Sequence, residues 1–283
     1  MKSIGFIGGD LRQHTLSELF RRDGYSVKIY GYTGAEDEVC DIEEIYDCDI
    51  IVFPMPTCSG NKIFAPFYSS GIYIEDLSIP EGKIIFYAGA NEELEKKLIM
   101  SGSRYINYMN REELLIKNAV PTAEGAAELA ISETAHTVFG SDVLITGYGN
   151  VAKALARTLK ALGANVTVAA RKPSALAEAW SCGYNAENIG AIKSYVGGYR
   201  LIFNTVPAMI FTDEVLEEIR EDALIIDLAS KPGGVNFGAA RAFKRRVIWA
   251  LSLPGKTAPI TAGKIIYDTV LGILSEIGGE KSE

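Results

Sequence analysis

Short apolar segments alternate with segments of helical periodicity along the whole chain. Apolar runs of strand length occur at 3–8, 26–30, 49–53 and 83–87, and again at 142–146, 165–170, 200–204 and 223–227. Helical spacing is found between them, in the first half near 11–23, 91–100 and 110–117. The turn-rich stretch at 54–66 is expected to be a loop. This alternation is typical of an α/β fold with parallel sheets.

The pattern also predicts how the chain divides. Pro121 and Thr122 favour the start of a connecting helix that runs to about 137 and leads into the strand at 142–146. The last segment, 262–278, has one apolar face and should pack against a domain. We therefore expect two α/β domains with a cleft between them, 1–118 and 119–255, and a C-terminal helix, 256–283, that returns to the first domain.

Composition narrows the class of protein. The 283 residues, 48% hydrophobic and 23% charged, suit a soluble globular protein of about two domains. The net charge of −8 argues against a nucleic-acid ligand, which requires a basic face. No run of about 18 apolar residues and no signal-peptide pattern occurs, so we expect a cytoplasmic protein with no membrane segment.

The cysteines give no sign of a metal site. Cys40, Cys48, Cys58 and Cys182 form no CxxC pair and lie in no histidine-rich context. Reduced thiols and no bound metal are expected.

A glycine turn in the second half predicts a dinucleotide site. Residues 142–171 read strand, Gly147-x-Gly149-x-x-Ala152, amphipathic helix, strand. The first glycine permits a tight turn, the second lets the backbone approach a pyrophosphate, and the helix N-terminus offers free N–H groups. Asn150 and Val151 begin this helix and belong to the predicted cofactor-binding set. The second domain is therefore expected to be an NAD(P)-binding Rossmann domain.

The end of the second strand of that domain indicates which dinucleotide binds. An NAD site usually has a carboxylate there, whereas this chain has Ala170 followed by Arg171, Lys172 and Ser174. A guanidinium engages a 2′-phosphate that a carboxylate would repel. NADP is favoured over NAD, although Arg171 would alternatively be a solvent-facing charge.

Two later segments follow strands at the edge where the nicotinamide half should bind. NTVP covers 204–207 and DLASKPGG covers 227–234. These segments either contact ribose and carboxamide or only cap turns. The residues concerned are Asn204, Thr205, Val206, Asp227 and Ser230.

The first glycine turn, IGFIGGDLRQ at 4–13, does not have dinucleotide spacing. With Gly8 as the first glycine, Asp10 and Gln13 stand where glycines are needed, and they would obstruct a pyrophosphate. Asp10 is instead expected to cap the following helix, with Arg12 and Gln13 directed at the cleft as the substrate side of the site.

Several motifs together identify a family. GGD-x-RQ at 8–13, PTAEG at 121–125, GYGNVAKALA at 147–156, DLASKPGG at 227–234 and LPGKTAPITAG at 253–263 occur in this order. This array resembles the A subunits of dipicolinate synthase, enzymes of spore-forming bacteria that make pyridine-2,6-dicarboxylate, over essentially the full chain. Asn150, Ala152 and Asn236 depart from the residues common in the family, which affects details of phosphate contact.

The resemblance implies an activity and partners. It implies an NADP-dependent oxidoreductase in the mother-cell cytoplasm that acts during sporulation with a flavoprotein-like B subunit. The implied substrate is a cyclic dicarboxylate, dihydrodipicolinate or its hydrated 4-hydroxytetrahydro precursor. A homo-oligomer is compatible with the sequence.

The dicarboxylate requires cationic and hydroxyl partners. We expect Arg12, Lys256 and Thr257 to bind its carboxylates and Glu124 to accept the proton, although Glu124 would alternatively be a structural carboxylate in the first turn of a helix. Further candidates for substrate contact are Asp10, Gln13, Thr122, Lys231 and Thr261.

Two other interpretations remain open at this point. One is a cofactor-binding regulatory or scaffold subunit whose partner carries catalysis. The other is a different NADP-dependent two-domain dehydrogenase, such as a 2-hydroxyacid dehydrogenase, but that family uses a late histidine and this chain has none after His136.

Overall fold

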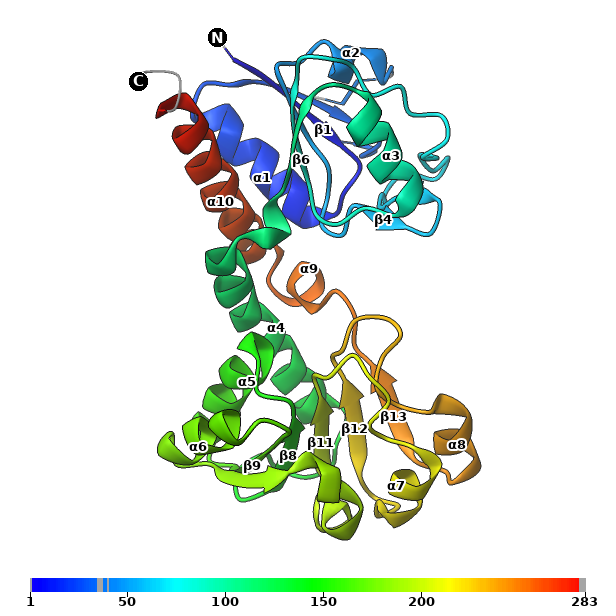
Figure 1. Ribbon diagram of the computed structural model, residues 1–283, viewed down its shortest axis with the longest axis vertical. Helices are drawn as coiled ribbons and strands as arrows, with labels where there is room; N and C mark the ends of the chain where they lie inside the picture. The colour runs from blue at the N-terminus through cyan, green and yellow to red at the C-terminus, as the bar shows by residue number, and fades with distance from the viewer. Residues whose placement is uncertain (1, 35–37, 40, 280–283) are drawn as a thin grey trace. The chain divides into compact units, whose positions relative to one another are not determined.

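The computed structural model describes residues 2–34, 38–39 and 41–279, and these form two compact units (Figure 1). Unit 1 comprises Met1–Lys117 together with Ala258–Glu283, and unit 2 comprises Asn118–Thr257. Each unit has a parallel sheet with helices on both faces. The predicted α/β class with parallel sheets is confirmed.

The described residues of unit 1 form a five-stranded parallel sheet in the order β2-β1-β3-β6-β7. The strands are β1 (Ser3–Ile7), β2 (Ser26–Tyr30), β3 (Ile50–Val52), β6 (Ile84–Tyr87) and β7 (Arg104–Asn107). The helices are α1 (Leu11–Arg22), α2 (Glu43–Tyr46), α3 (Glu92–Met100), η1 (Tyr108–Asn110), the first turns of α4 (Glu112–Ser132), and α10 (Pro259–Gly279). A short hairpin of β4 (Cys58–Ser59) and β5 (Lys62–Ile63) lies within the predicted loop at 54–66.

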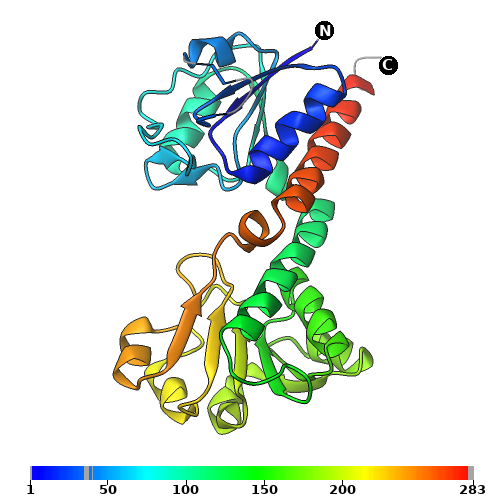
Figure 2. The ribbon, with the colours of Figure 1, turned by 180° about the vertical axis from the view of Figure 1, so that it is seen from behind.

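The C-terminal helix completes one face of unit 1. α1 and α10 lie side by side (Figures 1 and 2), and Phe20 of α1 and Val270 of α10 belong to the same buried cluster. Gly263 permits this approach, because a Cβ at that position would lie 2.6 Å from the Cβ of Thr15. α2 and α3 contribute to the cluster on the other face. The prediction that this helix packs on the first domain is confirmed.

The described residues of unit 2 form a six-stranded parallel sheet in the order β10-β9-β8-β11-β12-β13. The strands are β8 (Asp142–Thr146), β9 (Asn165–Ala170), β10 (Asn185–Asn188), β11 (Leu201–Asn204), β12 (Leu224–Asp227) and β13 (Arg246–Trp249). The helices are the rest of α4, α5 (Asn150–Ala161), α6 (Pro173–Ser181), η2 (Ile189–Ser194), η3 (Val196–Gly198), α7 (Asp213–Glu218), α8 (Phe237–Ala242) and α9 (Leu253–Thr257).

The strand order of unit 2 locates a ligand crevice. The chain moves outward from β8 to β9 and β10, then returns to β11 on the other side of β8 and continues to β12 and β13. The order therefore reverses between β8 and β11. In open parallel sheets, ligands bind at such a reversal, outside the carboxyl ends of the strands.

Two helices predicted near 110–117 and from 121 onward are one helix in the structure. α4 continues through Pro121, although proline removes one N–H from the helix ladder. The helix persists because both sides of the proline are anchored, with Leu114 in a buried cluster of unit 1 and Ala123 in one of unit 2. The predicted start at Pro121 is wrong, and Glu124 lies in a helix interior rather than in a first turn.

Three edge strands were not expected from the sequence. β7, β10 and β13 have the sequences RYIN, NAEN and RVIW, and each occupies an end of its sheet. They are short and contain polar residues because one of their edges is not covered by a neighbouring strand. An apolar-run criterion misses such strands.

Candidate functional site

The turn after β8 requires glycine at its first position. Gly147 has φ of +90°, and a Cβ there would lie 2.4 Å from Thr205 Oγ1. Its N–H donates to the Ala169 carbonyl at 2.8 Å, which ties the turn to the neighbouring strand. Both the backbone conformation and the close packing therefore exclude a side chain.

The second glycine leaves the N-terminus of α5 open. Gly149 is the N-cap residue of α5 and provides no side-chain cap, and the first turn holds no acidic residue. A Cβ on Gly149 would meet no described heavy atom within 4 Å. A helix N-terminus carries free N–H groups and partial positive charge. This open space suits a phosphate group, so the residues present fit a dinucleotide.

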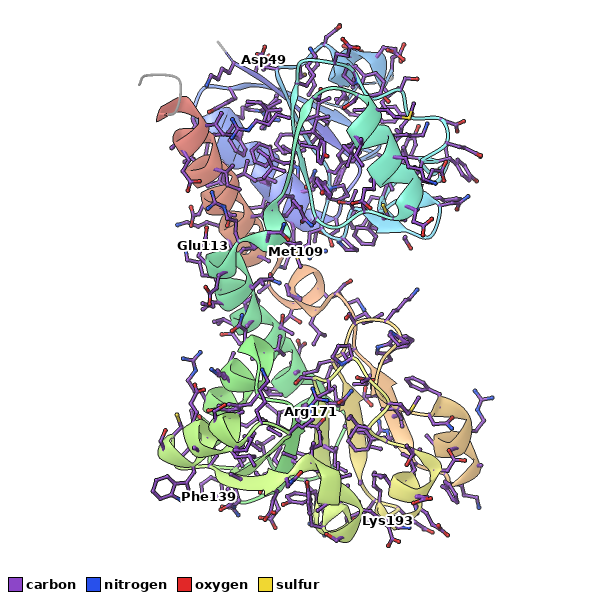
Figure 3. All side chains as sticks on the ribbon, viewed as in Figure 1. Asp49, Met109, Glu113, Phe139, Arg171 and Lys193 are labelled. Carbon is purple, nitrogen blue, oxygen red and sulfur yellow. The ribbon has the colours of Figure 1, made fainter. Side chains whose placement is uncertain are left out.

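A cavity of about 320 Å³ lies beside this turn. Its lining residues are Gly147, Tyr148, Ala170, Arg171, Lys172, Ala175, Ile189, Val206, Ala208 and Ile210. They include two cations, no carboxylate and several apolar side chains suited to a flat base. Figure 3 shows Arg171 toward the carboxyl end of the unit 2 sheet, with Phe139 and Lys193 toward the opposite end.

The predicted cofactor residues fall into different environments. Four of them, Gly147, Arg171, Lys172 and Val206, line the cavity. Four others are exposed and do not line the cavity. They are Gly149 and Asn150 at the start of α5, Ser174 in the first turn of α6, and Ser230 after β12. Val151 is half-buried against the core, and Thr205 Oγ1 donates to the Thr146 carbonyl at 2.7 Å.

Two predicted cofactor residues are completely buried. Asn204 and Asp227 end β11 and β12, and each is 0% exposed. Asn204 Nδ2 donates to Asp227 Oδ1 at 2.8 Å. Thr146, the last residue of β8, donates to Asn204 Oδ1 at 2.6 Å. Direct contact of Asn204 and Asp227 with a cofactor stays a prediction, and the partners that the structure gives them are protein groups.

Sequence reasoning did not select Tyr148, the residue between the two glycines. Burial is the main cause that raises the pKa of its hydroxyl, followed by a hydrogen bond to Cys182. Lys153 lies 5.3 Å from the centre of the Tyr148 ring and forms an ion pair with Glu178 at 2.7 Å. The ion pair connects α5 to α6, and Tyr148 itself lines the cavity. The sequence feature that could have identified Tyr148 is its position between the two glycines of the turn.

Part of the predicted substrate set lies on two elements of unit 2 that touch. Gly125 of α4 allows α9 to approach, since a Cβ there would lie 2.6 Å from Thr257 Oγ1. Thr257 Oγ1 donates to Glu128 on α4 at 3.3 Å. Glu124, one residue before Gly125, and Lys256, one residue before Thr257, are both exposed. The structure therefore brings the predicted acid–base residue and a predicted carboxylate-binding pair onto neighbouring helices.

The remaining unit 2 candidates are separate from this pair. Thr122 donates to the Asn118 carbonyl within α4 at 2.8 Å. Lys231 is exposed in the loop after β12. Glu128 was not selected from the sequence, although it lies four residues after Glu124 and so one helical turn away.

The unit 1 candidates are largely occupied by neighbouring groups. The Asp10 carboxylate accepts from the N–H of Arg12 at 3.0 Å and caps α1, as expected from the sequence. Arg12 is 4% exposed, and its Nη2 donates to Asp10 at 2.8 Å and to the Met55 carbonyl. Gln13 donates to the Val52 carbonyl at 2.9 Å, and Thr261 is exposed on α10. Substrate contact by these residues stays a prediction.

Metal-binding clusters and membrane-spanning helices are both absent from the described part of the chain. No group of three or more histidine, cysteine, aspartate or glutamate side chains is arranged there to hold a metal, and no helix there is long and apolar enough to cross a membrane. Cys48, Cys58 and Cys182 are free thiols, and Cys40 lies outside the described residues.

The fold and the cavity define a protein with an NAD(P)-binding Rossmann domain joined to a second α/β unit. The family model "Putative NAD(P)-binding" matches residues 134–239, and the model of the N-terminal domain of the dipicolinate synthase A subunit matches 3–109. The A subunit of dipicolinate synthase from Bacillus subtilis is 32% identical over 99% of this chain and 98% of that protein. The chain belongs to the family of dipicolinate synthase A subunits.

Solved structures agree with this assignment. The crystal structure of the dipicolinate synthase A subunit from Bacillus halodurans matches with a TM-score of 0.88 and 30% identity, covering 96% of this chain and 97% of that one. A transhydrogenase from Sinorhizobium meliloti matches with a TM-score of 0.72 and 15% identity over 97% of this chain and 94% of that one. The latter shows the shared fold alone.

Proposed function

We propose that the chain is an NADP-dependent oxidoreductase that converts dihydrodipicolinate, or its 4-hydroxytetrahydro precursor, to dipicolinate. The observation that carries this proposal is the open N-terminus of α5 beside a cavity with two cations and no carboxylate. Membership of the dipicolinate synthase A family supports this choice of substrate. The reaction would take place in the mother-cell cytoplasm during sporulation, together with a flavoprotein-like B subunit.

The preference for NADP rests on the end of β9. Ala170 occupies the position where an NAD site usually has an acidic residue, and Arg171 and Lys172 line the cavity next to it. Two exposed cations are suited to the 2′-phosphate of NADP. We expect Arg171→Ala to weaken NADPH binding about tenfold and to change NADH binding less than about twofold. Isothermal titration of both nucleotides checks this, and an equal loss for both would remove the basis for NADP preference.

The reaction removes a hydride and a proton from the dihydropyridine ring. When bound, NADP⁺ accepts the hydride. The exposed Glu124 carboxylate would accept the proton, and Lys256 and Thr257 on the adjacent α9 would hold substrate carboxylates. The hydrated precursor would additionally lose water before the ring becomes aromatic.

Glu124→Gln tests the assignment of the proton acceptor. We expect turnover to fall at least about 100-fold, because the amide cannot accept a proton, while NADPH affinity is unchanged. Glu112→Gln is the matched control, since Glu112 is an exposed glutamate on the same helix. Normal turnover of the Glu124→Gln protein would exclude this role.

The purified chain should be assayed with and without its partner subunit, with NADP⁺ as oxidant and dipicolinate and NADPH as products. Formation of both by this chain, alone or in the complex, in amounts that fall with Glu124→Gln supports the proposal. Product formation that requires the partner and is unaffected by any substitution in this chain would indicate a regulatory or scaffold role instead.

A further inference from the structure

Three buried polar side chains, joined by hydrogen bonds, connect three strands of unit 2 at the level of the cavity. Thr146, Asn204 and Asp227 are paired in register across β8, β11 and β12, and each is 0% exposed. Each is the last residue of a strand whose other described residues are mostly apolar, and burial of three polar side chains requires that they satisfy one another.

The hydrogen bonds run in one direction through the three residues. Thr146 Oγ1 donates to Asn204 Oδ1 at 2.6 Å, and Asn204 Nδ2 donates to Asp227 Oδ1 at 2.8 Å. An amide has both a donor and an acceptor, so Asn204 is the residue type that connects a hydroxyl donor to a carboxylate acceptor. The orientation of Asn204 is therefore fixed by its neighbours.

The same side chains hold the backbone of the loops that follow the strands. Asn204 donates to the Val206 carbonyl at 3.0 Å and accepts from the Val206 N–H at 3.1 Å. Asp227 accepts from the N–H groups of Ala229 at 3.0 Å and Gly234 at 2.9 Å. The carboxylate thus closes the loop 229–234 at both ends.

The loop after β12 packs closely against Asn204 and Val206. A Cβ on Gly234 would lie 2.2 Å from Asn204 Nδ2 and 2.8 Å from the Val206 carbonyl oxygen. Trp249 of β13 donates its indole N–H to the Ala229 carbonyl at 2.9 Å, which fixes the same loop from the other side. A small displacement of Asp227 would therefore move both the 229–234 loop and Val206.

We infer that Thr146, Asn204 and Asp227 are positioning residues that fix the loop after β12 against the nicotinamide half of the bound cofactor, without contacting it. This inference rests on the proposed NADP site. Of the groups that these three side chains hold, Val206 lines the cavity with Arg171, whereas Ala229 and Gly234 of the loop after β12 do not. Loss of the hydrogen bonds between Thr146, Asn204 and Asp227 should therefore weaken binding of the two halves of the dinucleotide unequally.

The test compares two probes, NADPH and adenosine 2′,5′-bisphosphate, which carries only the adenosine and phosphate part. Asp227→Asn puts an NH₂ group where the carboxylate accepts N–H groups, so one donor must face another. We expect this substitution to lower the affinity for NADPH about tenfold and the affinity for adenosine 2′,5′-bisphosphate less than about twofold.

Thr146 provides a conservative pair in case Asp227→Asn does not fold. Thr146→Val keeps the shape but loses the hydroxyl, whereas Thr146→Ser keeps the hydroxyl and loses a methyl group. We expect Val to reproduce the selective loss of NADPH affinity and Ser to retain wild-type affinity.

The outcomes separate the inference from the proposed function. If both probes weaken equally, or if Ser and Val have the same effect, the residues only support the fold and the inference is wrong. If the wild-type chain fails to bind adenosine 2′,5′-bisphosphate at all, the proposed NADP site itself is wrong. If the wild-type protein binds both probes, and Asp227→Asn and Thr146→Val lower the affinity for NADPH alone, the inference is supported.

Discussion

The turn after β1 and the turn after β8 share the order strand, glycines, helix, yet they differ in what occupies the helix N-terminus. In unit 1, Gly8 and Gly9 both have positive φ, 64° and 101°, and a Cβ on Gly9 would lie 2.3 Å from the Cβ of Gln13. Asp10 then caps α1 with its own carboxylate. In unit 2, a Cβ on Gly149 would have no heavy atom of the described residues within 4 Å, and α5 has no side-chain cap.

The two turns differ in what supplies negative charge near the helix N-terminus. In unit 1, the N–H groups of Gly8 and Gly9 donate to the carbonyls of Tyr30 and Phe64, each at 2.7 Å. The negative charge near the N-terminus of α1 is part of the chain itself. In unit 2, neither the N-cap nor the first turn of α5 supplies a negative charge, which is the environment that suits a ligand anion. The glycine spacing differs between the two turns, and the N-cap residues differ as well, aspartate in the first turn and glycine in the second.

The largest effect is expected when the turn before α5 receives the capping residue of the turn before α1. Gly149→Asp introduces the capping carboxylate at a residue with φ of −87°, which any side chain tolerates. We expect NADPH affinity to fall about 1,000-fold by charge repulsion at close range, and the free energy of unfolding to change by less than about 0.5 kcal/mol. Fluorescence titration and urea unfolding measure the two quantities.

Gly149→Asn is the matched control, because the amide caps the helix without charge. We expect Gly149→Asn to lower the affinity for NADPH no more than about tenfold. Equal losses for Asp and Asn would show that the space, rather than the charge, is what the ligand needs.

The ion pair of the first turn should matter for stability and not for nucleotide binding. Arg12→Ala leaves the nearly buried Asp10 carboxylate without its guanidinium, and we expect a loss of about 3 kcal/mol in the free energy of unfolding. NADPH affinity should remain within about twofold of wild type. A stable Arg12→Ala protein with lost turnover would instead favour the direct substrate role predicted from the sequence.

A second substitution isolates the charge effect. The double variant Asp10→Asn with Arg12→Ala retains a helix cap but removes the unpaired charge, so it should recover about half of the lost stability. Urea unfolding of the single and double variants forms the comparison.

The two glycines of the second turn should respond differently to alanine. Gly147→Ala adds a Cβ that collides with Thr205 at a positive φ, and we expect a loss of about 2 kcal/mol. Gly149→Ala meets nothing within 4 Å and should cost less than about 1 kcal/mol. Similar losses at both positions, measured by thermal unfolding, would contradict the description of the second glycine as open.

The smallest effect is expected at the amino-terminal end of the unit 2 sheet, where Asp222 precedes β12. The hydrogen bond from Arg220 is the largest cause that holds the pKa of Asp222 at about 2, followed among the lowering causes by the hydrogen bond from Arg200. Because this pKa is below the ordinary 3.8, the pair stabilises the folded state above about pH 4, and the contribution is lost as the pH falls through about 2.

Asp222→Asn therefore tests whether NADPH affinity depends on the charge near Gly149 or on the net charge of the protein. It should lower stability slightly at pH 7, become indistinguishable from wild type near pH 2, and leave NADPH affinity within about twofold. A large gain in affinity would show that net charge, rather than the local charge at Gly149, governs binding.

Much of the fold could be predicted because buried parallel strands are continuous apolar runs. The strands around β1 and β8 were located within a residue or two, and helical periodicity located α1 and α10. β10 could not be predicted, because NAEN contains no apolar pattern and is held by pairing with β9. The continuity of α4 across Pro121 also depends on packing in the two units, which local helix preferences do not report.

The candidate site was predictable where a residue's role depends on its backbone. Gly147 and Gly149 could be identified because glycine chemistry is local. Asn204 and Asp227 could be placed at strand ends, but whether their side chains face a ligand or each other depends on the register of three strands distant in sequence. For the same reason, the pairing of Arg12 with the Met55 carbonyl was not visible in the sequence.

The location of α10 in unit 1 has a consequence for biosynthesis. Unit 1 is composed of the first and the last parts of the chain, whereas unit 2 is one continuous stretch between them. On a ribosome, all of unit 2 emerges before α10 is translated, and until then the apolar side of α1 that contains Phe20 has no covering helix. The nucleotide-binding unit is thus able to fold first, whereas the uncovered side of α1 is exposed to aggregation and chaperone binding until α10 has been translated.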